Sequence, residues 1–119
     1  MELGHFEVSL RVTDVRRAVE FYRELGFEHA GGDLARGWAT MRRGTVQVGL
    51  YEGIESNLLT FIGGDVFANA RELERRGLVL RTAAGIEPDG SAGATVADPD
   101  GNVIYLNTLP DEAAGNRSE

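Results

Sequence analysis

The chain repeats one pattern of helix signals, and this internal repeat restricts the possible folds more than any other feature of the sequence. An aspartate precedes an apolar run with helical spacing at Asp14 and again at Asp65, and a glycine closes each run, at Gly26 and Gly77. Aspartate caps helix N-termini and glycine ends helices, so both segments are predicted to be helices. The two starts lie 51 positions apart (65 − 14), which indicates two copies of one supersecondary unit.

Strands are predicted around both helices. Residues 6–12 alternate, with Phe6, Val8, Leu10 and Val12 on the face turned toward the first helix, which is typical of a half-buried strand. The other predicted strands are a short one opening at Phe27, then residues 38–43, 45–52, 58–62, 78–82, 92–97 and 102–108. The predicted turns are Gly31-Gly32-Asp33 and Asp98-Pro99-Asp100-Gly101.

Each copy therefore has the order βαβββ. The predicted fold class is α+β, with two tandem βαβββ modules forming a curved mixed sheet around a ligand cavity. The 119 residues suffice for one domain, expected over residues 1–109 with modules at about 5–53 and 57–108. Residues 110–119 are polar and without periodicity, and a flexible C-terminal tail is predicted there.

Composition restricts the partners. The chain has no cysteine, which excludes disulfides and thiolate metal sites. Its formal net charge of −7 repels phosphate backbones, so no nucleic-acid partner is expected; the charge either favours a cationic ligand or serves only solubility. The apolar stretches are too short to span a membrane, and the first residues lack signal-peptide features, so a cytoplasmic protein is expected.

Side chains that point away from the helices are the candidates for ligand contact, because side chains alternate along a strand. The cavity-facing candidates are Glu7, Ser9, Gln47, Tyr51, Leu58, Thr60, Tyr105 and Asn107. Trp38, beside a predicted turn, is expected either to stack on a planar ligand or to pack in a core or dimer interface. Aromatic walls with scattered polar groups are typical of small-molecule pockets.

Three segments in this order resemble the vicinal oxygen chelate superfamily, which contains glyoxalase I, extradiol dioxygenases and bleomycin-resistance proteins. The segments are Val8-Ser9-Leu10-Arg11-Val12-Thr13-Asp14, Ala18-Val19-Glu20-Phe21-Tyr22 with Leu25-Gly26-Phe27, and Asp98-Pro99-Asp100-Gly101-Asn102. The resemblance covers about residues 6–108. It implies the paired βαβββ fold, whereas function must be argued from the site.

The resemblance also locates the superfamily's metal site. Metal-dependent members carry His or Glu on the first and last strand of each half, at positions that correspond to Glu7, Gln47, Leu58 and Tyr105. Only Glu7 is a good ligand for a divalent cation, so no metal and no cofactor are expected. The segment from Trp38 to Gly44 resembles the bleomycin-resistance branch, which implies ligand binding without a metal and a homodimer.

Several side chains admit more than one interpretation. Glu7 either anchors a cationic or hydroxyl group, acts as a base, or pairs with Arg11. Tyr105 either contacts a ligand or fills the volume of a missing metal site. His5 and His29 are interpreted as surface or structural residues. The arginine pairs 16–17, 42–43 and 75–76 are interpreted as solvated surface.

Three functions follow from these observations. The first is a protein that is not an enzyme and sequesters a hydrophobic, aromatic natural product or antibiotic. The second is a metal-independent isomerase, cyclase or hydrolase with Glu7 or Tyr105 as general acid or base. The third is a metal-dependent lyase or dioxygenase with unusual ligands.

Overall fold

The structure is a computed structural model that describes residues 1–111 and divides into two compact units. The N-terminal unit is Glu7–Leu58, and the C-terminal unit consists of Met1–Phe6 with Leu59 onward. Most of the predicted tail, residues 112–119, lies outside the described residues. A single domain over residues 1–109 stays a prediction. No helix in residues 1–111 is long and apolar enough to cross a membrane.

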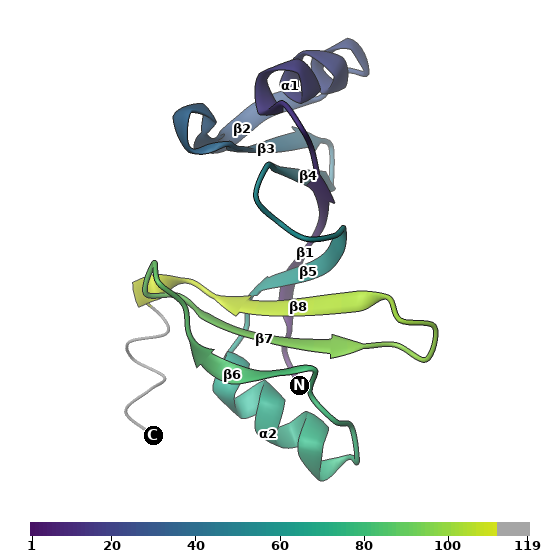
Figure 1. Cartoon of the computed structure of the whole chain (residues 1–119), viewed down its shortest axis with the longest axis vertical. Helices are drawn as coiled ribbons and strands as arrows, with labels where there is room; N and C mark the ends of the chain where they lie inside the picture. Colours follow the sequence, from purple (N-terminus) through teal and green to yellow (C-terminus); the bar gives the residue numbers. More distant parts are fainter. Residues whose placement is uncertain (112–119) are drawn as a thin grey trace. The chain divides into compact units, whose positions relative to one another are not determined.

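The N-terminal unit is one βαβββ module (Figure 1). Its strands lie in the order β2-β3-β4-β1, and β1 runs parallel to β4 while β3 is antiparallel to both of its neighbours. Its elements are β1 (Gly4–Arg11), α1 (Val15–Glu24), β2 (Glu28–Asp33), the 3₁₀ helix η1 (Leu34–Arg36), β3 (Trp38–Arg43) and β4 (Val46–Tyr51).

The C-terminal unit repeats this arrangement (Figure 1). Its strand order is β6-β7-β8-β5, with β5 parallel to β8 and β7 antiparallel to both of its neighbours. Its elements are β5 (Leu58–Gly63), α2 (Val66–Arg75), β6 (Thr82–Ile86), β7 (Ala92–Ala97) and β8 (Val103–Thr108). The α+β class and the two βαβββ modules predicted from the repeat are thus confirmed.

The helix signals act as predicted. Asp14 accepts hydrogen bonds from the backbone N–H groups of Arg16 and Arg17, and Asp65 accepts one from that of Ala68, so both satisfy donors that a helix leaves unpaired. Gly26 and Gly77 have φ angles of 93° and 91°. Side chains rarely adopt this left-handed conformation, which explains glycine at both helix ends.

Each helix covers one face of its own sheet and leaves the other face free of helix (Figure 1). The core under α1 consists of Val15, Val19, Ala39, Met41, Val48 and Leu50, with Leu10 and Val12 packed against it. The core under α2 consists of Val66, Ala92, Ala94 and Leu106, with Phe61 and Ile104 packed against it. The predicted faces of β4 and β8 are therefore correct.

Three local predictions are wrong. Gly31-Gly32-Asp33 is not a turn: it continues β2 beyond a bulge, and Asp33 caps η1. The strand predicted at 78–82 begins only at Thr82, because Leu78 and its neighbours form a loop beside α2. Phe6 does not pack under α1 but against Phe61, with ring centroids 5.2 Å apart. Val46 shares the phase of Val48 and Leu50, but as the first residue of β4 it is 52% exposed.

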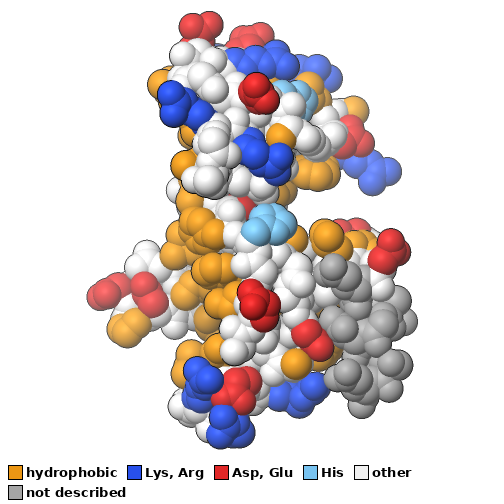
Figure 2. All heavy atoms as spheres, turned by 180° about the vertical axis from the view of Figure 1, so that it is seen from behind, with side chains coloured by type: hydrophobic (Ala, Val, Ile, Leu, Met, Phe, Trp, Pro, Cys, Tyr) orange, Lys and Arg blue, Asp and Glu red, His pale blue; other side chains and the backbone are white. Residues whose placement is uncertain are grey.

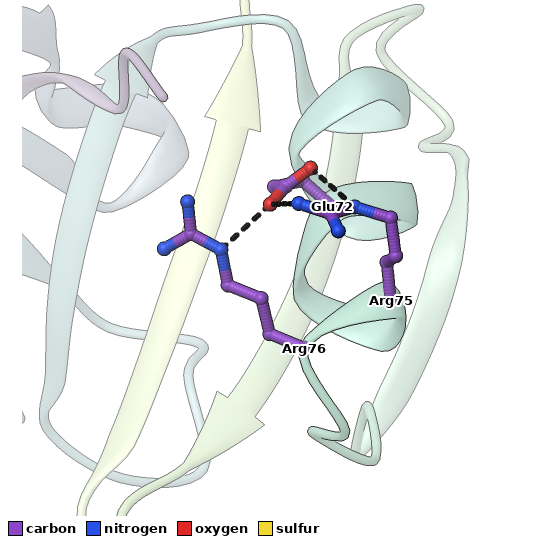
Figure 3. Close-up of polar contacts among 3 residues, drawn as sticks. All are labelled: Glu72, Arg75 and Arg76. Carbon is purple, nitrogen blue, oxygen red and sulfur yellow. Dashed lines mark hydrogen bonds and ion pairs between the residues drawn. The ribbon is translucent and has the colours of Figure 1, made fainter.

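The arginine pair at the end of α2 is held by one carboxylate (Figure 3). Glu72 accepts hydrogen bonds from Arg75 Nε at 3.0 Å and from Arg76 Nε at 2.6 Å. These contacts, with that of Arg75 the largest, lower the pKa of Glu72. Figure 2 likewise shows basic side chains beside acidic ones near both ends of the face that it draws, which favours a solvated surface over a nucleic-acid stripe.

Candidate functional site

The free face of the N-terminal unit carries the candidate residues of β1 and β4. Val48 and Leu50 lie in the core under α1, so Gln47, Gly49 and Tyr51, which alternate with them, lie on the opposite face. Strand pairing places Ser9 beside Gly49. The sequence placed these side chains on one face, and the structure brings them into direct contact.

The carboxylate of Glu7 is the centre of this cluster. Its Oε2 accepts hydrogen bonds from Ser9 Oγ and from the hydroxyl of Tyr51, both at 2.8 Å. Its Oε1 accepts one from Gln47 Nε2 at 2.9 Å. Glu7 is 1% exposed, and the three neutral donors supply the hydrogen bonds that a buried carboxyl group requires.

Arg42 extends the cluster by one residue. Its Nη2 donates to Gln47 Oε1 at 2.8 Å, and the amide nitrogen of Gln47 is then turned toward Glu7. Because an amide has one acceptor side and one donor side, Arg42 fixes the orientation in which Gln47 can donate to Glu7. Arg42 on β3 thereby stabilises the carboxylate of Glu7 on β1 through the neutral side chain of Gln47 on β4.

Two aromatic rings lie beside the carboxylate. Trp38 and Tyr51 are stacked with ring centroids 6.0 Å apart and an interplanar angle of 4°, and strand pairing sets them side by side. Trp38 lies on the free face, because the next residue, Ala39, is buried under α1. Trp38 is 36% exposed, so part of its ring surface is open.

Gly49 makes room for the cluster. A Cβ atom at this position would collide with the carboxylate of Glu7 and with the ring of Tyr51. The same device recurs in the C-terminal unit, where a Cβ on Gly93 would collide with Glu87 and Tyr105. In both units a carboxylate and a tyrosine thus lie over a glycine.

The C-terminal unit carries three of the remaining candidate residues, Thr60, Tyr105 and Asn107, and Leu58 is the last residue of the N-terminal unit. Tyr105 donates to Glu87 at 3.3 Å and accepts from Asn107 Nδ2 at 3.0 Å. Burial, and next the charge of Glu87, raise the pKa of Tyr105 to about 12. Thr60 lies beside Tyr105 in the sheet and is 3% exposed. Leu58 opens β5 half-buried.

Two of the alternative interpretations can be compared with the structure. The guanidinium of Arg11 donates to the backbone carbonyl of Glu55, and Glu7 has the neutral partners described above, so the structure gives no ion pair between Arg11 and Glu7. His29 Nε2 lies 3.0 Å from the carbonyl of Gly31, which fits a structural residue. His5 is exposed on β1.

The strand register corrects one expected correspondence. Ser9 pairs with Gly49, and Thr60 pairs with Tyr105. The opening strands are related by 51 positions (9 + 51 = 60), and the closing strands by 56 (49 + 56 = 105). Tyr105 therefore corresponds to Gly49, whereas Gln47 corresponds to Val103. The phase was predicted correctly, but the register was wrong by two residues.

The donor set does not fit a resident divalent cation. Around Glu7 it consists of one carboxylate, a neutral amide and two hydroxyls, and Gly49 adds no side chain. No group of three or more His, Cys, Asp or Glu residues that could hold a metal ion occurs within residues 1–111. Three or four such donors are the usual requirement.

Sequence reasoning missed three residues of these clusters. Arg42 was assigned to the surface, although its phase on β3 equals that of Trp38. Glu87 and Ser91 lie between the strands predicted at 78–82 and 92–97, and neither was assigned a role. The turn residues between these two residues, Pro88-Asp89-Gly90, could have indicated both positions. Glu87 N–H donates to the carbonyl of Ser91 at 2.8 Å, and such a tight turn returns its side chains to the sheet.

Neither a family model nor a curated protein matches the sequence. Solved structures do resemble it. A Legionella pneumophila protein described as an NAD-dependent benzaldehyde dehydrogenase has a TM-score of 0.76 and 18% identity, over 87% of this chain and 98% of that one. A glyoxalase/bleomycin resistance protein/dioxygenase superfamily member from Vibrio splendidus 12B01 has a TM-score of 0.62 and 17% identity, over 87% and 97%.

A third similar structure is the methylmalonyl-CoA epimerase of Streptomyces coelicolor in complex with 2-nitronate-propionyl-CoA, with a TM-score of 0.58, 20% identity and coverages of 91% and 96%. The likenesses define the architecture as a pair of βαβββ modules. This is the fold of the glyoxalase/bleomycin resistance protein/dioxygenase superfamily, as the sequence resemblance predicted. At these identities the comparison shows the fold alone.

Proposed function

We propose that the chain binds a planar aromatic small molecule, a natural product or antibiotic, on the free face of its N-terminal unit. It holds this ligand without a metal, releases it chemically unchanged, and so protects its host by sequestration. The observation that supports the proposal is the parallel stack of Trp38 on Tyr51 beside a buried carboxylate.

The stack is organised before a ligand arrives. The hydroxyl of Tyr51 is fixed at 2.8 Å from Glu7, which is itself held by Ser9 and Gln47. A ring that is already immobile loses little conformational entropy on binding, so more of the stacking energy contributes to affinity. The exposed surface of Trp38 then offers a flat apolar contact to an aromatic ring.

The burial of Glu7 and Ser9 assigns them a supporting role in this proposal. Glu7 and Ser9 are 1% and 2% exposed, and Glu7 holds Gln47 and Tyr51 by hydrogen bonds. Trp38, Gln47 and Tyr51 are the side chains that a ligand can reach. Leu58, where β5 begins, and Thr60, Tyr105 and Asn107 on the C-terminal unit stay proposed ligand-facing residues of their own units.

Acid–base catalysis is less well supported. Both carboxylate oxygens of Glu7 already accept hydrogen bonds from protein donors, and a pKa of about 12 leaves Tyr105 a weak acid near neutral pH. The epimerase of the same fold is an enzyme, so chemical change of the ligand is measured directly in the test below. The metal-dependent alternative lacks a suitable donor set.

The proposal includes a cytoplasmic homodimer. Phe6 and Leu59, both in the C-terminal unit, are 45% and 39% exposed, and a second copy would remove such apolar surface from water. Sedimentation velocity at micromolar concentration is expected to give the mass of two chains. The mass of one chain would refute this part.

The test uses the single tryptophan as the reporter. A panel of planar aromatic antibiotics is titrated into the full chain, and Trp38 fluorescence is followed. Stacking is expected to quench it with one ligand per chain. Mass spectrometry of the recovered ligand is expected to give its starting mass; a changed mass would support an enzyme and refute sequestration.

Matched variants separate stacking from general hydrophobicity. Trp38→Ala is expected to weaken binding about tenfold, as the loss of one aromatic contact implies. Phe21→Ala removes a more exposed aromatic ring from α1, 59% exposed, and is expected to leave the affinity unchanged. Equal effects of the two variants, measured by calorimetry, would refute the proposed site.

A further inference from the structure

The free face of the C-terminal unit carries a separate polar cluster. Leu106 lies in the core under α2, so Tyr105 and Asn107, on either side of it, lie on the opposite face. Antiparallel pairing places Thr95 beside Tyr105, and Gly93 beside Asn107. The four free-face positions, Gly93, Thr95, Tyr105 and Asn107, therefore lie on β7 and β8 within one unit.

Glu87 lies over this face with few partners. A Cβ on Gly93 would meet its carboxylate, which shows how closely the side chain approaches the sheet. Within residues 1–111, the hydrogen bond to this carboxylate is a long one, 3.3 Å from the hydroxyl of Tyr105. The contrast with Glu7 is direct: that carboxylate has three donors at 2.8–2.9 Å.

The cluster has an excess of negative charge. Glu87 contacts the hydroxyl of Tyr105 directly, and Asp89 is linked to it through Ser91 and Asn107. Besides burial, the charges of both carboxylates raise the pKa of Tyr105. The ion pairs recorded in the described chain join Asp33 and Glu72 to arginines and involve neither of these carboxylates. Asp89 is bound by Ser91, through its N–H at 2.9 Å and its hydroxyl at 2.6 Å.

A buried hydroxyl on the same face also lacks a partner. Thr95 Oγ1 is inaccessible to solvent and makes no hydrogen bond in the part of the chain that the structure describes. More than nine in ten buried polar groups are paired, so an unpaired one indicates a missing partner. This observation is independent of the charge on Glu87.

We propose that this face binds the protonated amine of a small organic molecule, with Glu87 as its charge partner and Thr95 Oγ1 as a second acceptor. An ammonium group supplies three donors and one positive charge, which are what the two side chains lack. Tyr105 supplies a neutral wall beside the amine. The net charge of −7 also favours the approach of cations. This site goes beyond the proposed aromatic site, which lies on the N-terminal unit, and shares none of its residues.

The test titrates the full chain with benzylamine, which is protonated at pH 7, and follows backbone amide resonances by NMR. Shifts are expected at Thr95 and Tyr105. Benzyl alcohol has nearly the same shape without the charge, and no saturable shift is expected with it. Equal binding of the alcohol, or no binding of benzylamine by the native chain, would overturn the proposal.

Variants locate the charge partner. Glu87→Gln is expected to weaken benzylamine binding about tenfold or more, as loss of a charged hydrogen bond implies. Glu74→Gln removes the same charge from α2, on the other face of this unit, and is expected to change the affinity less than twofold. Equal losses of affinity in Glu87→Gln and Glu74→Gln would mean that only the net negative charge of the protein attracts the amine. That result would overturn the proposed site. Trp38→Ala is expected to have no effect here, so failure of this proposal and of the aromatic site can be told apart.

Discussion

Exchanging the carboxylate of Glu7 and the amide of Gln47 tests the polar cluster of the N-terminal unit. In Glu7→Gln the oxygen of the introduced amide can still accept from Ser9 and Tyr51, but its nitrogen faces Gln47 Nε2, a donor, at the 2.9 Å contact. If Gln47 rotates, its nitrogen meets Arg42 Nη2 at the 2.8 Å contact. The first arrangement leaves a part-buried donor unpaired, and the second places two donors face to face at the exposed Arg42 contact.

The expected magnitude follows from these contacts. An unpaired buried donor costs about 1–3 kcal/mol, and two hydrogen bonds that lose a charged acceptor each weaken by about 1 kcal/mol. A neutral amide is less costly to bury than a carboxylate, which offsets part of this loss. We expect Glu7→Gln to lower the free energy of unfolding by about 2 kcal/mol, and Tm by about 8 °C for a domain of this size.

The double variant is the decisive sample. Gln47→Glu alone places two carboxylates in contact and is expected to destabilise by at least as much. In E7Q/Q47E the amide at position 7 donates to the carboxylate at position 47, which also accepts from Arg42. Urea unfolding of all four proteins is expected to give a coupling energy of about 2 kcal/mol or more, well above the error of additivity. Additive destabilisation by the two substitutions would refute the proposed series of hydrogen bonds from Arg42 through Gln47 to Glu7.

Three further predictions concern other parts of the molecule. The pKa of Tyr105 is about 12 in the folded chain and about 10 when unfolded. The unfolded state therefore loses this proton first, and the free energy of unfolding should fall as pH rises from 10 to 12. Urea unfolding at both pH values measures this decline, which Tyr105→Phe should remove. Gly49→Ala should displace Glu7 and lower Tm, whereas Gly31→Ala, with nothing near its added Cβ, should not; calorimetry distinguishes them. Asp14→Ala and Asp65→Ala should each cost about 1 kcal/mol as lost helix caps, and urea unfolding that leaves either unchanged would contradict the cap.

Helices and strand faces could be predicted because they depend on local rules. Asp14 and Asp65 cap their helices because a short acidic side chain reaches the first free N–H groups. The phase of β4 follows from alternation and the need to bury Val48 and Leu50. These features depend only on residues close in sequence, and the repeat shows the helix signals in both copies.

The wrong predictions involve pairing that alternation does not specify. Two glycines and an aspartate at 31–33 fit a turn, but the same residues fit a bulged edge strand that leads into a helix cap. Leu78, Val79 and Leu80 resemble a strand, yet they form a loop that lines a groove beside α2.

The sequence predicted which face of the sheet carries the candidate site residues, but it did not predict the contacts between them. Phase alone placed Glu7, Gln47 and Tyr51 together, but a shift of two residues preserves phase, and so Gln47 was paired with the wrong counterpart. The amide orientation set by Arg42 and the room left by Gly49 depend on three strands at once. Glu87 lay in a loop, where no periodicity indicates which way a side chain turns.

A crystal structure of the full chain with the tightest aromatic ligand of the fluorescence panel tests the central claim most directly. The account predicts a ligand ring parallel to the indole of Trp38, on the side away from Tyr51, with Glu7 still bound to Ser9, Gln47 and Tyr51. A ligand held elsewhere, with the surface of Trp38 left open to solvent, would contradict it.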